Sequence, residues 1–268
     1  MRLDYVRGFV FDVDGTLVHR DGDDVHVLPG AREVLERIRA SGRPLVLFTN
    51  GSHVAPEVFA AGLRDVGLGV GDDELLTPLR SVQTYLRAHA GSSLLPFATD
   101  AARAYLEAAG VRLVDGDAGG RVDAVLVVHT DAVEFAELES AGRAILGGAR
   151  LLTGSYVPAY AGANGPIFSR GAMVTAALAK VTGARPIVVG KPSRAAVRTF
   201  AEQLAMRPDE VAVIGDDLDL DVALGRLGGS RTILVASGIS GRVDLGSVPA
   251  RRRPDAVVDG VANLLDWL

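Results

Sequence analysis

Short apolar runs alternate with helix-like segments in the first part of this chain. The runs 8–11 (GFVF) and 45–48 (LVLF) are continuous and apolar, which is typical of buried strands. Between them, apolar residues recur at helical spacing over 31–38, and the same spacing returns over 56–66. The pattern therefore predicts strands that are each followed by a helix.

The C-terminal part repeats this alternation. Apolar runs at 187–190 (IVVG), 211–215 (VAVIG) and 232–235 (TILV) predict three more strands. Ser193 is placed to cap a helix whose apolar face runs over 197–204. Because continuous apolar strands that alternate with helices are buried on both faces, we expect an α/β protein with a Rossmann-like, doubly wound parallel sheet.

The middle of the chain has an alternation of its own. Strands are predicted at 122–128 and 150–153, and helices at 135–145 and 173–181. About 105 residues suffice for a small α/β domain with its own core. We expect a core interrupted by an inserted α/β cap domain, with boundaries at 1–77 (core), 78–182 (cap) and 183–268 (core).

Composition excludes several classes of function. The 268 residues include no cysteine, which rules out disulfides, thiolate nucleophiles and cysteine-bound metals. The net charge of −5 argues against nucleic acid as a partner, and Arg251–Arg253 is the only basic run. The uncharged stretch Leu151–Ser169 is rich in Gly and Pro, and the N-terminus lacks a long apolar region. We expect a cytoplasmic protein with no membrane segment.

Polar residues follow four of the predicted strands. They are Asp12 and Asp14 in FDVDG, Thr49 and Asn50 in FTNGS, Lys191 in GKPS, and Asp216, Asp217, Asp219 and Asp221 in GDDLDLD. Each group taken alone is ordinary turn or loop composition. Since the carboxyl ends of parallel strands share one crevice, we expect the four groups to converge.

Such a set of residues suits phosphoryl chemistry. Mg²⁺ prefers oxygen ligands, and a divalent cation relieves the repulsion among clustered carboxylates. The cation, an ammonium group and a hydroxyl would together stabilise charge on a phosphoryl group. One carboxylate can attack phosphorus and form an aspartyl-phosphate, while a second carboxyl moves the proton.

The four motifs resemble those of the haloacid dehalogenase superfamily of phosphohydrolases. DVDGT, FTN, GKP and GDDLDLD match its four motifs in order. The long insertion resembles the α/β cap of the branch with p-nitrophenyl, phosphoglycolate and pyridoxal phosphatases. The resemblance covers essentially the whole chain. It implies a Mg²⁺-dependent phosphatase of small phosphorylated metabolites.

By this resemblance, the acidic residues have assigned roles. Asp12 is the nucleophile, and Asp14 is the general acid and base. The metal ligands are Asp12, Asp14 (through its backbone carbonyl) and Asp216. Asp221 supports the metal site from behind its ligands.

The resemblance also assigns the phosphate-binding residues. Thr49 and Lys191 hold the transferring phosphoryl group, and Asn50 shapes the loop around it. Specificity would come from the cap, where substrate-facing candidates follow the predicted strands. These candidates are His129, Thr130, Ser155, Tyr156 and Tyr160. The resemblance also suggests a homodimer formed through the cap.

The sequence leaves two other functions open. A phosphotransferase or mutase would use the same core with an acceptor other than water. A non-enzymatic aspartyl-phosphate switch would also use acidic residues, a Thr and a Lys, although here Lys191 precedes the last acidic cluster. The fourth motif departs from the branch at Asp217 and Leu220. The physiological substrate therefore stays open among phosphoglycolate, pyridoxal phosphate, sugar phosphates and nucleotides.

Overall fold

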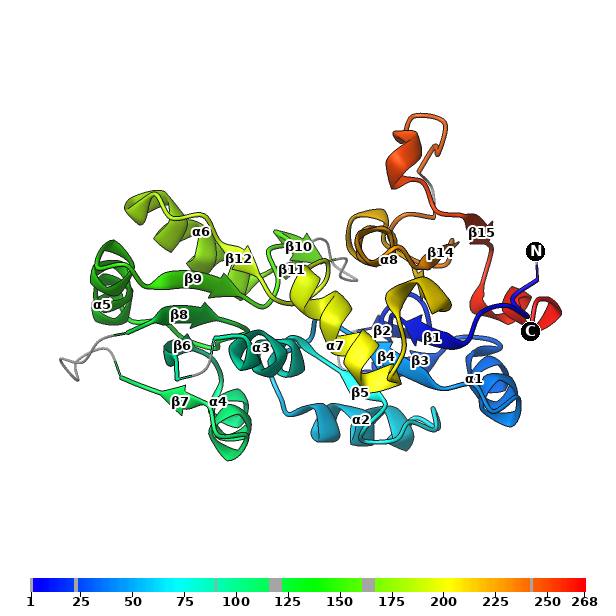
Figure 1. Ribbon diagram of the computed structural model, residues 1–268, viewed down its shortest axis with the longest axis horizontal. Helices are drawn as coiled ribbons and strands as arrows, with labels where there is room; N and C mark the ends of the chain where they lie inside the picture. The colour runs from blue at the N-terminus through cyan, green and yellow to red at the C-terminus, as the bar shows by residue number, and fades with distance from the viewer. Residues whose placement is uncertain (1, 22–23, 90, 116–121, 161–166, 242) are drawn as a thin grey trace. The chain divides into compact units, whose positions relative to one another are not determined.

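The chain forms two compact units, seen in the computed structural model of Figure 1. The structure describes all residues except 1, 22–23, 90, 116–121, 161–166 and 242. We call the units the core unit (1–49, 57–76 and 192–268) and the inserted unit (50–56 and 77–191).

The core unit is built on a six-stranded parallel sheet. Its strands, in spatial order, are β15 (Ala256–Val258), β14 (Arg231–Val235), β13 (Val211–Gly215), β1 (Gly8–Phe11), β4 (Leu45–Phe48) and β5 (Leu75–Leu76). Val10 of β1 lies opposite Val213 on one side and Val46 on the other. This order confirms the predicted doubly wound parallel sheet, and it places strands far apart in sequence beside each other.

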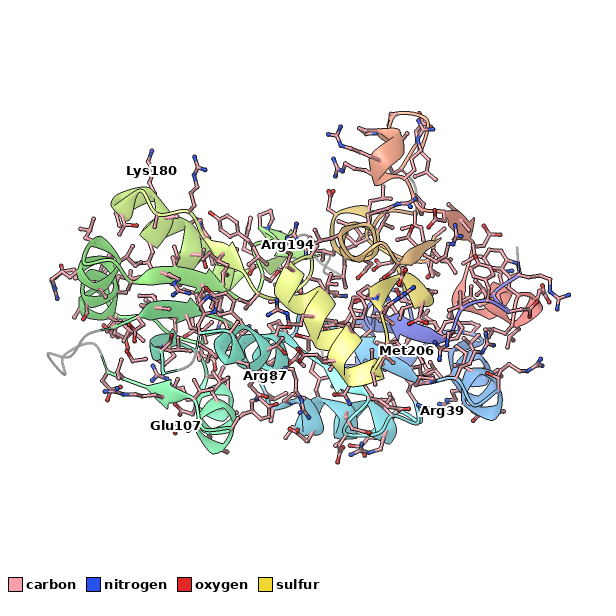
Figure 2. The ribbon with its side chains drawn as sticks, in the orientation of Figure 1. Arg39, Arg87, Glu107, Lys180, Arg194 and Met206 are labelled. Atoms are coloured by element: carbon pink, nitrogen blue, oxygen red, sulfur yellow. The ribbon has the colours of Figure 1, made fainter. Side chains whose placement is uncertain are left out.

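The helices of the core unit form where apolar spacing predicts them. They are α1 (Ala31–Ala40), α2 (Pro56–Asp65), α7 (Arg194–Leu204) and α8 (Ala223–Gly228). The Ser193 hydroxyl accepts a bond from the Ala196 amide (3.0 Å) and so caps α7 as expected. Phe200 packs into the apolar cluster around Phe48, and Met206, just after α7, packs against the same cluster (Figure 2).

Short elements complete the core unit. They are the hairpin β2 (Val18–Asp21) and β3 (Asp24–Val27), the π-helical turn η2 (Leu218–Val222), and the 3₁₀ turns η1 (Pro208–Glu210), η3 (Ala250–Arg252) and η4 (Val261–Asp266). Along the chain, the hairpin follows β1, η1 and η2 flank β13, and η3 and η4 flank β15.

The inserted unit has a second, five-stranded parallel sheet. Its strands, in spatial order, are β12 (Ile187–Val188), β9 (Arg150–Thr153), β8 (Ala124–Val127), β6 (Ser93–Phe97) and β7 (Arg112–Leu113). Its other elements are α3 (Pro78–Arg87), α4 (Asp100–Ala108), α5 (Phe135–Leu146), α6 (Arg170–Thr182) and the pair β10 (Ala159–Tyr160) and β11 (Ile167–Phe168). None of the helices described here is both long and apolar enough to cross a membrane.

One strand belongs to a different sheet from the one predicted. The sequence predicts a core strand at 187–190, but Ile187 lies opposite Leu152 of β9, and Val188 lies opposite Thr153. The inserted unit accordingly extends to 191 rather than to 182, and it also takes in 50–56. A short apolar strand has the same pattern in either sheet, so only the tertiary pairing decides its place.

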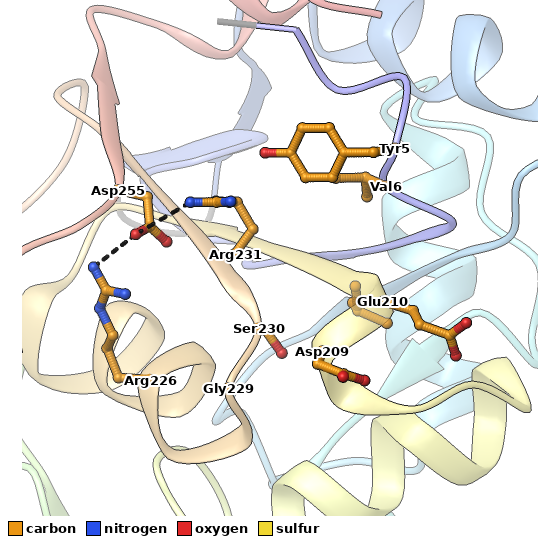
Figure 3. A pocket seen from close by; sticks show the side chains of 10 residues that line it. Tyr5, Val6, Asp209, Glu210, Arg226, Gly229, Ser230, Arg231 and Asp255 are labelled. Atoms are coloured by element: carbon orange, nitrogen blue, oxygen red, sulfur yellow. Dashed lines mark ion pairs between the residues drawn. The ribbon is translucent and has the colours of Figure 1, made fainter.

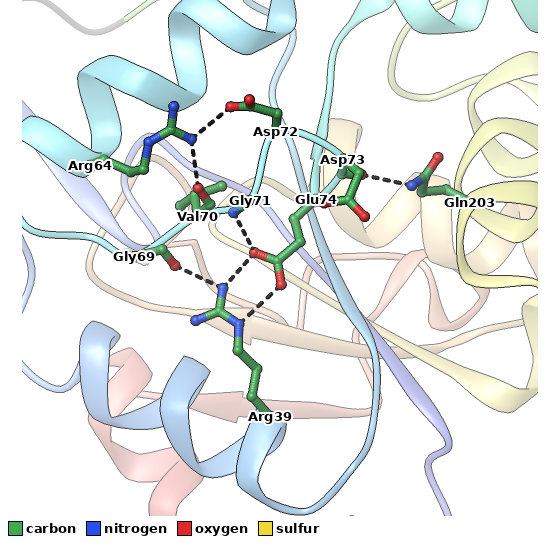
Figure 4. A network of polar contacts seen from close by, with 9 residues as sticks. All are labelled: Arg39, Arg64, Gly69, Val70, Gly71, Asp72, Asp73, Glu74 and Gln203. Atoms are coloured by element: carbon green, nitrogen blue, oxygen red, sulfur yellow. Dashed lines mark hydrogen bonds and ion pairs between the residues drawn. The ribbon is translucent and has the colours of Figure 1, made fainter.

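A polar network holds the turn that leads into β5 (Figure 4). The Arg39 guanidinium donates to both carboxylate oxygens of Glu74 (3.0 and 2.6 Å) and to the Gly69 carbonyl (2.7 Å). Glu74 also accepts a bond from the Gly71 amide (2.8 Å). Because this bidentate pair connects α1 to the turn, it fixes the edge of the core sheet.

A second network lies at the amino ends of β14 and β15 (Figure 3). It borders a cavity of about 210 Å³. The Asp255 carboxylate accepts bonds from the Thr232 amide (2.8 Å) and hydroxyl (3.1 Å), and it pairs with Arg226 (2.9 Å). Burial raises the pKa of Asp255, but the Thr232 bonds and the Arg226 charge outweigh burial and leave this pKa below its usual value.

Asp255→Asn is expected to lower the free energy of unfolding by about 1–3 kcal/mol at neutral pH, because hydrogen bonds to a charged group are lost. Since the folded-state pKa of Asp255 is lowered, its contribution is complete above the ordinary carboxyl pKa of about 3.9. This contribution to stability is lost as pH falls through the folded-state pKa of Asp255. Urea unfolding at neutral and acidic pH measures this. The exposed Asp4→Asn is the control, and a difference from wild type that does not shrink in acid contradicts the assignment.

Candidate catalytic and metal site

Three buried carboxylates meet at the carboxyl edge of the core sheet. Asp12 follows β1, Asp216 follows the adjacent strand β13, and Asp221 lies in the turn η2. One oxygen from each lies within 4.8 Å of the other two, and the residues are 9, 3 and 2% exposed. The Asp12 amide donates to the Ile214 carbonyl (2.8 Å), so the sheet itself brings Asp12 beside Asp216.

Backbone groups fix the position of Asp216. Its Oδ2 accepts a bond from the Ile239 amide (2.7 Å), and its carbonyl accepts one from the Ser240 amide (3.0 Å). A Cβ at Gly15 would lie 2.5 Å from this Oδ2, and a Cβ at Gly238 would lie 1.9 Å from it. Only glycine fits this closely at both positions, and Gly15 also has a positive φ of 84°.

The turn η2 positions Asp221. Oδ2 of Asp221 accepts a bond from the Asp217 amide (3.2 Å). The Asp217 side chain in turn accepts bonds from the amides of Asp219 (2.7 Å) and Leu220 (3.2 Å). Single π-helical turns of this kind are frequent at functional sites. Asp217 and Leu220, where the fourth motif is unusual, thus belong to the turn that presents Asp221. The Asp221 carboxylate itself lies within the acidic group.

The loop after β1 holds the other residues of the first motif. Asp14 is half-exposed and pairs with Arg20 (2.5 Å), so its side chain lies outside the group of three carboxylates. The buried Thr16 hydroxyl donates to Asp12 Oδ2 (3.4 Å). The Ser237 hydroxyl donates to the Gly15 carbonyl (2.8 Å), which connects this loop to the segment after β14.

The predicted phosphate-binding residues divide between the two units. Thr49 is buried at the end of β4, and its amide donates to the Leu76 carbonyl (3.1 Å). Lys191 follows β12 of the inserted sheet and is 2% exposed. Asn50 Oδ1 accepts a bond from the Lys191 amide (2.8 Å), and its Nδ2 donates to the Lys191 carbonyl (3.0 Å). Three of the four motifs therefore end strands of the core sheet, and the Lys191 motif does not.

The three carboxylates suit a divalent cation. Burial of several like charges within 4.8 Å is unfavourable unless a positive charge or protons compensate them. Carboxylate oxygens are hard ligands of the kind that Mg²⁺ and Ca²⁺ take. The donor set therefore fits a metal ion of this class.

Comparisons with known proteins agree with the geometry. The family model described as haloacid dehalogenase-like hydrolase matches residues 9–112, and a second hydrolase model of the same kind matches 188–264. Bovine chronophin is 30% identical over 291 residues, covering 98% of this chain and 93% of that protein. This chain belongs to the haloacid dehalogenase-like hydrolases.

Further relatives of this hydrolase are also phosphatases by name. The ribonucleotide monophosphatase NagD of Escherichia coli K12 is 29% identical, over 97% of this chain and 98% of its own. The structure of p-nitrophenyl phosphatase from Archaeoglobus fulgidus superposes with a TM-score of 0.86 at 28% identity, covering 98% of this chain and 99% of its own. The prediction that this chain is a haloacid dehalogenase-type phosphatase is confirmed.

The specificity candidates of this hydrolase all lie in the inserted unit. His129 is partly exposed just after β8, and Tyr156 is exposed after β9. Thr130 is buried and its hydroxyl donates to the Ala132 carbonyl (2.8 Å), so this hydroxyl serves the turn. Ser155 is buried, with its Oγ 3.4 Å from Asn50 Nδ2. The side chain of Tyr160 lies outside the described part of the structure.

Sequence reasoning assigned no role to several residues at the acidic site of this hydrolase. Thr16 and Arg20 contact the two catalytic candidates of the first motif, and Gly238, Ile239 and Ser240 enclose Asp216. The sequence signal for the last three is the segment SGIS (237–240), just after β14 and at the same edge of the core sheet as the first, second and fourth motifs.

Asp216→Asn is expected to raise the thermal unfolding midpoint in EDTA, because it relieves repulsion among three buried carboxylates. A gain of 1 kcal/mol corresponds to about 2–4 °C. In excess MgCl₂ the wild type should gain stability and the variant should not, since a ligand stabilises only the state that binds it. Calorimetry with both additives measures this, with Asp65→Asn on α2 as control. A Mg²⁺-induced shift of equal size in the variant and the wild type contradicts the metal site.

Proposed function

We propose that this hydrolase is a Mg²⁺-dependent phosphatase of small phosphorylated metabolites that acts through an aspartyl-phosphate on Asp12. The observation that carries the proposal is the buried group of Asp12, Asp216 and Asp221 at the carboxyl edge of the core sheet. This edge is where open parallel sheets bind their ligands. A carboxylate there can act both as metal ligand and as nucleophile.

The reaction has two balanced steps. In the first, an oxygen of Asp12 bonds to phosphorus while the bond to the leaving oxygen breaks, and Asp14 gives that oxygen a proton. In the second, Asp14 takes a proton from water, whose oxygen bonds to phosphorus as the bond to Asp12 breaks. Phosphate leaves, and both aspartates return to their starting states.

The remaining residues hold the reacting groups. In this proposal Asp12, Asp216 and the Asp14 carbonyl ligate Mg²⁺, with Asp221 beside them. Mg²⁺, when bound, offsets negative charge on the phosphoryl oxygens and on the carboxylates.

Thr49 and Lys191 bind the phosphoryl oxygens in this proposal. The two bonds between Asn50 and the Lys191 backbone support it, because they fix the backbone from which the lysine side chain extends. Neutralising charge that develops in the transition state is the main way in which such sites accelerate phosphoryl transfer.

Two alternatives use the same residues and are separated by experiment. A phosphotransferase or mutase would pass the phosphoryl group to an alcohol, so products are analysed with and without added alcohols. A phospho-switch would retain a long-lived phosphate on Asp12 after treatment with acetyl phosphate. Rapid release of inorganic phosphate in water favours the phosphatase.

Asp12→Asn is expected to lower kcat for p-nitrophenyl phosphate by about 10³-fold or more, because the amide cannot attack phosphorus. Asp65→Asn should keep wild-type activity, and EDTA should abolish the activity of the wild type and of Asp65→Asn. The fold is checked by circular dichroism. A folded Asp12→Asn protein with appreciable turnover rules out Asp12 as the nucleophile. A folded, metal-loaded wild type that is inactive on a panel of phosphate monoesters rules out the phosphatase.

We also propose that the inserted unit forms a homodimer interface. Its exposed apolar side chains include Leu146 at the end of α5 and Val181 near the end of α6, each more than two-thirds exposed. Apolar side chains of this kind are enriched at the cores of interfaces. Leu146→Ser with Val181→Ser is expected to shift the dimer toward monomer in light scattering, with Asp65→Asn of the core unit as control. A wild type that is monomeric at all concentrations refutes the dimer.

A further inference from the structure

A cluster of ionisable side chains lies at the carboxyl edge of the inserted sheet. His129 follows β8, and its Nε2 lies 3.5 Å from Oδ1 of Asp131. Nη1 of Arg170, the first residue of α6, lies 3.0 Å from the same oxygen and 3.2 Å from the Asp131 carbonyl. The ring of His53 stands edge-on to that of His129, with centroids 5.7 Å apart. We call these four residues the histidine cluster.

The segment 50–53 crosses this edge and connects the cluster to Lys191. At one end Asn50 bonds to the Lys191 backbone, beyond β12. At the other end the Ser52 hydroxyl accepts a bond from the His129 amide (3.1 Å), beyond β8. All these residues belong to the inserted unit, so their arrangement does not depend on the core unit.

The strand order sets the spacing between the cluster and the lysine. β12 and β8 are separated by β9 alone, and neighbouring strands lie about 4.8 Å apart. The ends of β12 and β8 are therefore about 10 Å apart along the edge. This separation is comparable to the length of a small phosphorylated metabolite.

We propose that the histidine cluster binds the leaving group of the substrate and favours a leaving group that carries a carboxylate. This inference rests on the proposed function, in which Lys191 binds the phosphoryl group. His129, Arg170 and Asp131 are all substantially exposed, so a ligand can reach them. Imidazole and guanidinium N–H groups are donors suited to a carboxylate, and a guanidinium can bind it with two bonds.

Asp131 opposes this preference and sets its strength. Its carboxylate lies within 3.5 Å of both His129 and Arg170, so it competes with a substrate carboxylate for the same donors. Removal of its charge should strengthen the preference, whereas removal of a donor should weaken it. Opposite effects from neighbouring residues are not expected of a merely structural cluster.

The test compares 3-phosphoglycerate with glycerol 3-phosphate, which differ by a carboxylate in place of a hydroxymethyl group. The wild type should have the larger kcat/KM for 3-phosphoglycerate. The ratio of the two kcat/KM values should fall about threefold to fivefold in His129→Asn and in Arg170→Gln, and it should rise in Asp131→Asn. Arg143→Gln, which removes an exposed arginine paired with Glu139 on α5, is the matched control and should leave the ratio unchanged.

Failure of this inference is distinguishable from failure of the proposed function. If p-nitrophenyl phosphate is hydrolysed but the ratio is the same in all variants, the phosphatase stands and the cluster is not a leaving-group site. A wild type with the larger kcat/KM for glycerol 3-phosphate likewise shows that the cluster does not favour a carboxylate, while the phosphatase activity stands.

If no ester is hydrolysed, the proposed function fails. The binding of 3-phosphoglycerate then tests whether the histidine cluster is a carboxylate site. The chain has five histidines, so imidazole NMR signals are assignable by single His→Asn variants. A shift of the His129 signal with 3-phosphoglycerate that is absent with glycerol 3-phosphate supports the site. Equal shifts, or none, overturn it.

Discussion

The mutual repulsion of three buried carboxylates is the constraint on which the rest of the structure depends. Asp12, Asp216 and Asp221 are buried close together, where like charges repel each other more strongly than they do in water. Backbone amides of Ile239 and Asp217 hold two of these carboxylates in place. The repulsion that remains is what gives such a site its affinity for a divalent cation, so the same charges that cost stability provide a reason to bind metal.

Parallel sheets are the second part of the arrangement, because they align strand ends regardless of distance along the chain. β1 and β13 are neighbours in register, so residues 12 and 216 lie together. The inserted unit uses the same principle in a separate sheet, whose carboxyl edge gathers Lys191, Ser155 and His129. Each unit thus presents polar residues at one edge, while its central strands, such as β1, β13 and β8, stay apolar and buried.

Much of this was predictable from the sequence, and particular residues show why. Ser193 caps α7 because capping depends only on residues three positions apart. Asp12 is recognisable because four polar groups follow predicted strands in the order of four known motifs, although each group taken alone is ordinary turn composition. The strand 187–188 pairs in the inserted sheet and not in the core sheet that the sequence predicts, because its apolar pattern contains no information about its partner strand. The strands β2 (VHRD) and β3 (DVHV) lack a continuous apolar run, and β5 and β7 have only two residues each, so no local pattern marks them.

The sequence by itself determined the α/β class, the main strands and helices, and the residue types available for phosphoryl chemistry, because these depend on local spacing and on the chemistry of single side chains. Only the tertiary structure decided which strands are neighbours, and with them that Asp221 joins the acidic group and that Lys191 follows a strand of the inserted sheet. It also decided that His53 and His129, 76 positions apart, lie ring against ring. Contacts between distant segments follow from pairing and packing, which a one-dimensional pattern does not contain.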